Sequence, residues 1–185
     1  AMDTGVITLY DARTGGSVRY IKGTHLHNWR IIENPKFFIP DSVADTLRRG
    51  RYLQPHDLVT PTRACSTIGL FSVVRSWQTR AILTREIAIW RPTPKCRIDR
   101  WLLLALLSLK VVHEQFRFLV LMQTNREDLG ERWRELRLPI PRDTKQRETW
   151  TQPIREYFEA ESQVREAFDG LAKVLDPSLF ATRPG

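Results

Sequence analysis

Residues 48–74 read RRGRYLQPHDLVTPTRACSTIGLFSVV, and their pattern sets the architecture of the chain. Two runs, Asp57–Thr60 and Ile68–Val74, are rich in β-branched and aromatic residues, and a polar segment separates them. Such residues favour extended backbone, and a polar segment between two such runs is typical of a loop that joins strands. The pattern therefore predicts two strands joined by the loop 60–68, TPTRACSTI.

Similar short runs lie on both sides of this stretch. They predict further strands at Gly5–Tyr10, Ser17–Lys22, Lys36–Ile39, Ala81–Trp90 and Leu136–Ile140. A short helix is expected at Asp41–Arg49, where Val43 and Leu47 are four residues apart and Gly50 ends the pattern. Together these runs predict a mixed, partly antiparallel twisted sheet.

Two segments in the second half of the chain predict helices. Apolar residues between Arg100 and Gln123 recur too densely for a one-sided stripe, which favours one or two buried helices. Beyond Pro141, a heptad pattern predicts a long coiled-coil-type helix that starts near Pro153, with Thr151 as its cap, and ends before Asp176. The fold class is therefore expected to be α+β with a long C-terminal helix.

The heptad pattern marks one face of this helix. Its positions follow one another at spacings of 3 and 4 residues, with Glu161 as the one charged member. We expect the face to pack on another helix through Ile154, Tyr157, Val164, Phe168, Leu171 and Leu175. The alternative is a helix that lies on its own domain.

Charge divides the chain at the same place. Residues 1–142 hold 23 basic and 13 acidic side chains, whereas residues 143–176 hold 5 basic and 8 acidic ones. We therefore expect a basic recognition domain at 1–142, a helical arm for dimerisation or spacing at 143–176, and a tail at 177–185. A length of 185 residues suits one domain with an appended helix.

Composition favours nucleic acid as the partner. The basic residues are 23 Arg and 6 Lys, which give a net charge of +8. Arginine has a planar guanidinium that donates two hydrogen bonds at once to a phosphate or to a guanine edge. The alternative is a surface rich in solvated arginine.

No enzymatic motif is visible. The sequence has neither a dinucleotide-binding nor a phosphate-loop motif, no methyltransferase motif for a flipped base, and no nuclease set of carboxylates with a lysine. Its two cysteines are 31 positions apart without a CxxC pair, and a zinc site using His25 and His27 is a minor alternative. We therefore expect no catalysis, no cofactor and no metal.

The sequence also predicts a cytoplasmic protein without a membrane segment. No basic start is followed by an apolar stretch, and the longest apolar run, Trp101–Leu107, is too short to cross a bilayer.

Three polar segments carry the candidate DNA contacts. They are 60–68, 75–85 and 122–127, and each combines arginine with hydroxyl or amide side chains that can donate to phosphates or base edges. With two residues near the first strand, the expected contacts are Lys22, Thr24, Thr62, Arg63, Ser66, Thr67, Arg75, Arg80, Arg85, Thr124, Asn125 and Arg126.

The order of these features resembles a known family. Residues 48–74 are similar to the strand motif "x-x-Gly-Asp-hydrophobic" and following polar loop of target recognition domains in specificity subunits of type I restriction-modification systems, with His56 in place of the glycine before Asp57. ILTREIAIWRP (82–92) resembles the next strand, RIDRWLLLALLS (97–108) the first buried helix, and ERWRELRLPIPRDTKQRE (131–148) the segment before the long helix. Of the glycine-rich loop near 124–130, only Gly130 is present.

This resemblance implies a protein without catalysis of its own. Family members bind one half of a bipartite double-stranded DNA sequence and pair long helices antiparallel, and methyltransferase or nuclease subunits dock on that frame. The chain would then be the specificity module of a restriction or phage-defence system. The chain would be a half-subunit that homodimerises, would pair with a second recognition domain, or would be part of a longer chain.

Two other functions remain open at this point. One is a nuclease subunit with an unrecognised catalytic motif, and the other is a protein-interaction scaffold in which the arginines serve solubility or an acidic partner.

Overall fold

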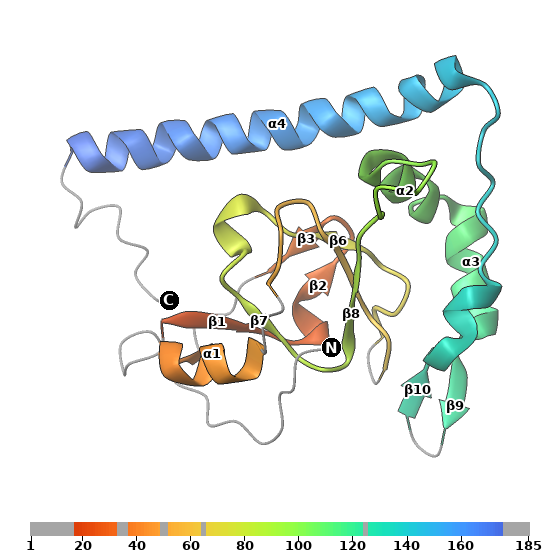
Figure 1. The fold of residues 1–185 in the computed structure, drawn as a ribbon, viewed down its shortest axis with the longest axis horizontal. Coiled ribbons are helices and arrows are strands. Elements are labelled where there is room, and N and C mark those ends of the chain that lie inside the picture. Colours follow the sequence, from red (N-terminus) through yellow and green to blue (C-terminus); the bar gives the residue numbers. More distant parts are fainter. Residues whose placement is uncertain (1–16, 33–36, 49–51, 64–65, 124–125, 176–185) are drawn as a thin grey trace. The chain divides into compact units, whose positions relative to one another are not determined.

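The computed structural model describes residues 17–32, 37–48, 52–63, 66–123 and 126–175. The fold is α+β, with mixed β-sheets, short helices and a long C-terminal helix (Figure 1). Two compact units make up the chain, Ala1–Pro139 and Ile140–Gly185. The expected strand Gly5–Tyr10 and the expected tail 177–185 lie outside the described residues.

The first sheet of unit 1 is mixed. Its central strand β1 (Val18–Ile21) pairs antiparallel with β4 (Phe38–Ile39) and parallel with β7 (Ile82–Leu83). The helix α1 (Asp41–Arg48) follows β4 directly and agrees with the short helix expected there.

The second sheet is antiparallel, and two of its strands come from the stretch 48–74. Strand β5 (Leu58–Pro61) lies between β6 (Ser72–Val73) and β8 (Ile87–Trp90). The expected strand 68–74 is shorter than predicted because the chain turns at residues 66–69, where Gly69 has a φ of 87°. The expected strand 81–90 is divided into β7 and β8 by a turn at residues 85–86.

Short elements complete the β-rich part of unit 1. Strand β2 (Leu26–His27) pairs antiparallel with β3 (Arg30–Ile31). The single-turn 3₁₀ helices η1 (Gly23–His25) and η2 (Ser76–Gln78) precede β2 and β7.

Two helices occupy most of the segment predicted to be helical. They are α2 (Arg100–Leu107), whose first turn is capped by the Asp99 carboxylate at 2.8 Å from the Leu102 N–H, and α3 (Lys110–Leu119). The last residues of the segment form a strand instead, because β9 (Leu121–Gln123) pairs with β10 (Arg126–Asp128) in a hairpin.

The strand expected at Leu136–Ile140 is wrong. The 3₁₀ helix η3 (Gly130–Glu135) leads into an extended segment without strand pairing. Pro139 has no N–H to donate, and the main-chain N–H and C=O of Arg137 both bond to the Gln115 side chain, at 2.8 and 2.9 Å. A side chain thus satisfies the groups that a neighbouring strand would otherwise bond.

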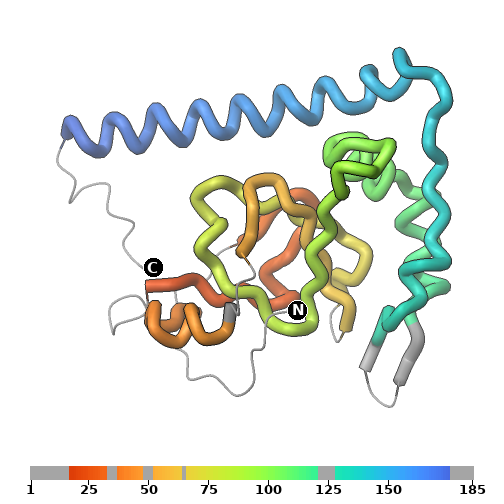
Figure 2. The backbone as a smooth tube through the Cα atoms, viewed as in Figure 1, coloured from red at the N-terminus to blue at the C-terminus, as the bar shows by residue number. Residues whose placement is uncertain are grey.

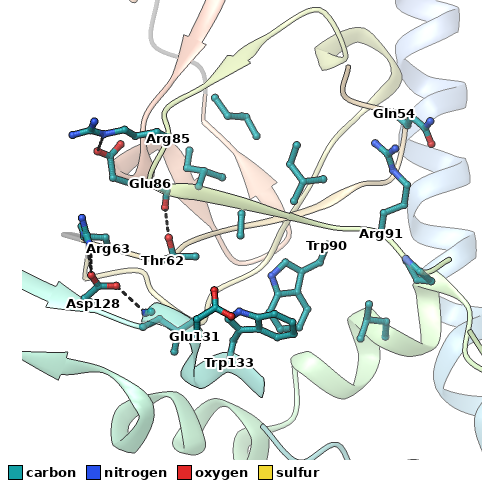
Figure 3. A pocket seen from close by; sticks show the side chains of 18 of the residues that line it. Gln54, Thr62, Arg63, Arg85, Glu86, Trp90, Arg91, Asp128, Glu131 and Trp133 are labelled. Carbon is teal, nitrogen blue, oxygen red and sulfur yellow. Dashed lines mark hydrogen bonds and ion pairs between the residues drawn. The ribbon is translucent and has the colours of Figure 1, made fainter. Parts of the chain in front are cut away.

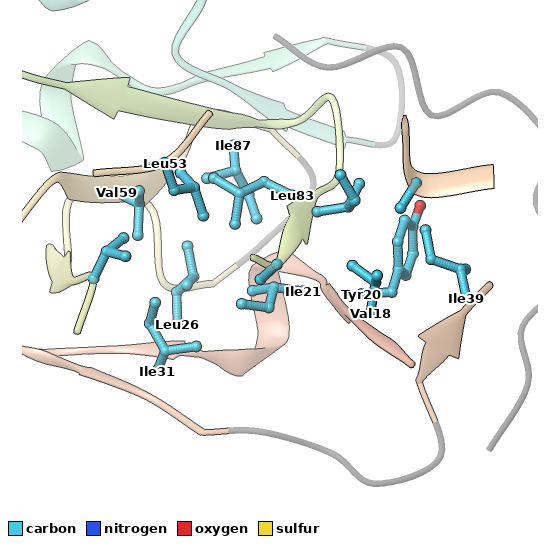
Figure 4. Close-up of a cluster of buried hydrophobic side chains, with 14 residues drawn as sticks. Val18, Tyr20, Ile21, Leu26, Ile31, Ile39, Leu53, Val59, Leu83 and Ile87 are labelled. Atoms are coloured by element: carbon cyan, nitrogen blue, oxygen red, sulfur yellow. The ribbon is translucent and has the colours of Figure 1, made fainter. Parts of the chain in front are cut away.

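The core of unit 1 joins the two sheets (Figure 4). Buried side chains from β1, β2 and β4 meet those of β5, β7 and β8, among them Ile21, Leu26, Val59, Leu83 and Ile87. This shared core fixes the loops that leave the strands, and those loops carry the candidate contacts.

Unit 2 consists largely of α4 (Thr144–Val174). The expected start near Pro153 is wrong, because the Asp143 carboxylate accepts the N–H groups of Lys145 and Gln146 at 3.1 and 3.2 Å. The helix therefore begins nine residues earlier and continues through Pro153, as the tube in Figure 2 shows. No helix in the described ranges is both long and apolar enough to cross a membrane.

Candidate nucleic-acid interface

Thr62 connects two of the three candidate segments. Its main-chain N–H and its side-chain hydroxyl both donate to the carbonyl oxygen of Glu86, at 2.7 and 2.9 Å. The loop after β5 is thereby held against the turn between β7 and β8, where Arg85 lies (Figure 3).

Arg63 connects the first segment to the third. Its Nε donates to Asp128 Oδ2 at 2.6 Å, and the two residues also form an antiparallel bridge. Asp128 ends β10 and is buried, and its other carboxylate oxygen accepts the Gly130 N–H at 2.8 Å. The β9–β10 hairpin is thus joined to the loop after β5.

The guanidinium groups at this junction face solvent. The Arg63 and Arg85 side chains are 52% and 69% exposed, and Arg85 donates to Glu86 at 3.3 Å. Burial raises the pKa of the Glu86 carboxyl, but hydrogen bonds from its own main-chain N–H and from the Arg85 and Thr84 side chains lower that pKa by more. The net pKa lies below the ordinary value, so Glu86 stays ionised and keeps Arg85 in place near neutral pH.

A second group of candidates lies where the same loop ends. The Thr67 hydroxyl donates to the carbonyl oxygen of Gly23 at 3.3 Å, and Thr24 and Ser66 are exposed. Lys22 lies over the Phe37 ring, with Nζ at 4.1 Å from the ring centroid.

His25 shapes the main chain beside this second group. Its Nδ1 accepts the Lys22 N–H at 3.2 Å, which requires that nitrogen to be unprotonated. Burial, and then the charges of Lys22 and His27, hold the pKa of His25 below its usual value. His25 is therefore neutral near pH 7.

The segment from Thr62 to Thr67 links both groups. We call the resulting surface the loop edge. It consists of Lys22, Thr24, Thr62, Arg63, Ser66, Thr67 and Arg85. Seven of the twelve expected contacts therefore lie at two junctions at the ends of one loop.

Arg75 does not belong to this surface, and its expected role in DNA contact is corrected. The residue is 5% exposed, and its Nη1 donates to the carbonyl oxygens of Trp29 and Val73 at 2.6 and 2.7 Å. A guanidinium that braces β6 against the loop between β2 and β3 cannot reach a DNA groove.

Of the other expected contacts, Arg80 lies against the start of α1, Arg126 lies in the strand that Asp128 joins to Arg63, and two are not described. The exposed Arg80 side chain pairs with Asp41 at the start of α1. Thr124 and Asn125 are outside the described residues, and Arg126 begins β10 opposite Gln123.

Sequence reasoning missed a groove along β8. Its volume is about 1540 Å³, and it extends from Arg63 and Arg85 to Arg91, with Trp90 and Trp133 between them (Figure 3). The two indole rings meet edge to face at 5.8 Å. Arg91 donates two hydrogen bonds of 2.6 Å to the buried Asp57 carboxylate, and the Asp57 contact raises the pKa of Arg91.

The sequence does contain a signal for this groove. The run RPTPKCRIDR (91–100) has four basic side chains and one acidic one, and the acid, Asp99, caps α2. Lys95 and Arg97 are exposed in the loop after β8. The sequence signal is this charge together with the neighbouring Trp90.

The described residues form no metal site, and they bury only part of the expected interface of α4. In the described ranges, no three His, Cys, Asp or Glu side chains are grouped as metal ligands. Of the expected interface residues of α4, Ile154 is buried, and the others are exposed: Tyr157, Val164, Phe168, Leu171 and Leu175.

Comparison of the chain with protein-family models and with curated proteins finds no match.

Proposed function

We propose that unit 1 binds double-stranded DNA sequence-specifically through the loop edge, as the non-catalytic specificity module of a restriction-modification or phage-defence system. One observation carries the proposal: Thr62 and Arg63 join three polar, arginine-bearing segments that are far apart in the sequence. Arginines held on neighbouring loops of a rigid core are suited to contact phosphates and base edges together.

The charge distribution supports this proposal. Residues 1–142 carry a net charge of +10, and residues 143–176 carry −3. A positive domain attracts the phosphate backbone, which supplies most of the affinity of DNA-binding proteins. The exposed guanidiniums of Arg63 and Arg85 add the geometry needed for bidentate contacts.

One backbone feature supports the resemblance to target recognition domains. His56 has a φ of 66°, a conformation that glycine adopts without strain, and the family motif has glycine at this position. Asp57, which follows, is buried and accepts hydrogen bonds from the Gln54 N–H and from Arg91. The motif therefore has a structural reason here: it turns the chain and anchors β5.

The partners follow from the same proposal. Exposed apolar residues on α4, among them Val164, Phe168 and Leu171, would pair with a helix of a second copy or of a second recognition domain. Methyltransferase or nuclease subunits would dock on the resulting frame and supply catalysis.

Selection from a pool of random duplexes at two salt concentrations tests the proposal. We expect enrichment of a short defined sequence and a steep loss of affinity at the higher salt. Metal-dependent cleavage by the purified chain would instead indicate a nuclease. Absence of duplex binding at physiological salt would instead indicate a scaffold.

Substitution of Arg85 tests the loop edge directly. Arg85→Ala removes an exposed guanidinium and is expected to weaken binding to the selected duplex by about 1–3 kcal/mol if Arg85 contacts a base. Arg165→Ala is the matched control, since Arg165 is also exposed and pairs with a neighbouring carboxylate, Asp169. Equal affinities of the two variants for the selected duplex would remove Arg85 from the interface.

A further inference from the structure

Strand β8 has one edge that no strand in the described part of the chain pairs with. Among the described strands it pairs with β5 alone, in the register Thr60 to Ala88 and Pro61 to Ile87. The Thr62 N–H bonds to the Glu86 carbonyl, and the direction of main-chain groups alternates along an antiparallel strand. The main-chain N–H and C=O groups of Ala88 and Trp90 therefore point toward β5, and those of Ile87 and Ile89 point away from it.

Two further observations agree with this assignment. Pro61 has no N–H and stands opposite Ile87, at a position where no ladder hydrogen bond is required. The Ile87 N–H bonds back to the Thr84 carbonyl at 3.1 Å, on the side away from β5. The Ile89 N–H and C=O make no main-chain hydrogen bond with any residue that the structure describes.

The groove runs along this edge. Residues 85–92 all line it, together with Leu129, Trp133 and Leu138 from later in the chain. Its volume of about 1540 Å³ exceeds the usual range for small-molecule pockets, roughly 300–1,000 Å³. An open groove of this size along an unpaired strand suits a length of polymer chain.

The hydrogen-bonding pattern favours a polypeptide over a nucleic acid. An exposed strand edge presents N–H donors and C=O acceptors in alternation, and another strand satisfies both. The phosphate backbone of a nucleic acid offers acceptors but no donor for the carbonyl oxygens of Ile87 and Ile89.

Charge at one end of the groove defines the chemistry of that polypeptide. The acidic side chains that line the groove are already paired: Asp128 with Arg63, Glu86 with Arg85, and Glu131 with Arg134. Lys95 and Arg97, in the loop that follows β8, are exposed and form no ion pair with a described residue. The loop after β8, whose Cys96 and Ile98 line the groove, therefore carries two cations that form no ion pair with a described residue.

We propose that the open edge of β8 binds an extended, acidic segment of a partner protein as an added strand. The strand would bond to the C=O of Ile87, whose N–H is already bonded to Thr84, and to the N–H and C=O of Ile89, and its acidic end would lie near Lys95 and Arg97. The groove shares Thr62, Arg63 and Arg85 with the loop edge, but the proposed strand pairing uses the main chain of β8 and does not depend on DNA binding.

A fluorescein-labelled decapeptide provides the probe. It alternates Val and Thr and begins with three Glu residues, which an antiparallel strand would place near Lys95 and Arg97. We expect saturable binding to the full chain by fluorescence anisotropy, weakened at least tenfold when alternate peptide amides are N-methylated, because methylation blocks strand pairing without changing the side chains. Absence of saturable binding, or equal binding of both peptides, would overturn the proposal.

Two substitutions locate the peptide. Ile89→Pro removes an N–H that β5 does not use, so the sheet is retained, and the affinity for the peptide should fall at least tenfold. Ile89→Val is the matched control and should bind as the unaltered chain does. The double variant Lys95→Glu, Arg97→Glu should weaken binding of the acidic peptide and not of a peptide in which Gln replaces Glu.

Further outcomes separate this proposal from the proposed function. Ile89→Pro should leave binding to the selected duplex unchanged. Peptide binding therefore tests the strand proposal, and duplex binding tests the proposed function independently. If Ile89→Pro binds the peptide normally, the strand does not add at β8. If a single-stranded oligonucleotide displaces the peptide in the unaltered chain and binds with higher affinity, the groove belongs to the nucleic-acid surface and the proposal is wrong.

Discussion

At the scale of single residues, two side chains show how this chain builds its loops. Arg75 is buried and holds two carbonyl oxygens, so an arginine in a polar segment is here part of the scaffold. His56 has a positive φ and stacks near Trp101, at 4.8 Å between ring centroids. The role of Arg75 is not visible in a sequence pattern, because it depends on Trp29, 46 residues earlier in the chain.

Substitutions of His56 should separate backbone strain from side-chain contact. His56→Ala loses the contact with Trp101 and keeps the unfavourable φ, whereas His56→Gly loses the same contact and relieves the strain. We expect the glycine variant to be more stable than the alanine variant by about 1 kcal/mol. Urea unfolding of both variants measures the difference, and equal midpoints would show that the φ of 66° carries no cost.

At the scale of elements, the sequence predicted what depends on local pattern. Strands β1 and β4 and helices α1 and α2 lie within the ranges expected from their apolar residues and turn signals, and β5 is shifted by one residue from the expected Asp57–Thr60. Two failures have different causes, the first a tertiary contact and the second a local helix cap. Gln115 of α3 satisfies the main chain of Arg137, and Asp143 outweighs Pro153 in setting where α4 begins.

For the candidate site too, local features were predictable from the sequence and tertiary contacts were not. Its polar loops were predictable from composition, but their association was not, since the contacts Thr62 to Glu86 and Arg63 to Asp128 join residues 24 and 65 positions apart. The groove was missed because an unpaired strand edge is a property of the sheet and has no sequence motif.

The exposed face of α4 leads to a prediction at the same scale. Phe168→Asp places a charge among exposed apolar residues, and it should raise the dissociation constant of a helix-mediated dimer by roughly thirtyfold or more. Gln163→Asp, an exposed polar position outside the heptad seam, is the control with the same added charge. Sedimentation velocity distinguishes the species, and an unchanged dimer for Phe168→Asp would refute the assignment of this face.

At the scale of the whole molecule, charge is divided between the two parts of the sequence. The basic residues that could contact phosphates belong to residues 1–142, and residues 143–176 are acidic overall. If the chain binds DNA as proposed, long-range attraction comes from residues 1–142, and the acidic helix adds none of its own.

Salt dependence of DNA affinity checks this division. If about five phosphates are neutralised, the logarithm of the binding constant should fall with the logarithm of salt concentration at a slope of about −4.5. Arg165→Gln in α4 should leave the slope unchanged. Arg85→Gln should reduce its magnitude by about 1 if Arg85 contacts a phosphate, and should leave it unchanged if Arg85 contacts a base. A slope altered equally by both substitutions would contradict the proposed division of charge.

Cys96 lies in the loop after β8, lines the groove and is exposed. Replacement of Cys65 by serine would leave its thiol as the single site for a maleimide dye, since the chain has two cysteines. The emission of such a dye would report directly on occupancy of the groove, in a protein whose arginines are all retained. The fold thus provides its own attachment point for optical titrations at the place where a partner strand is expected.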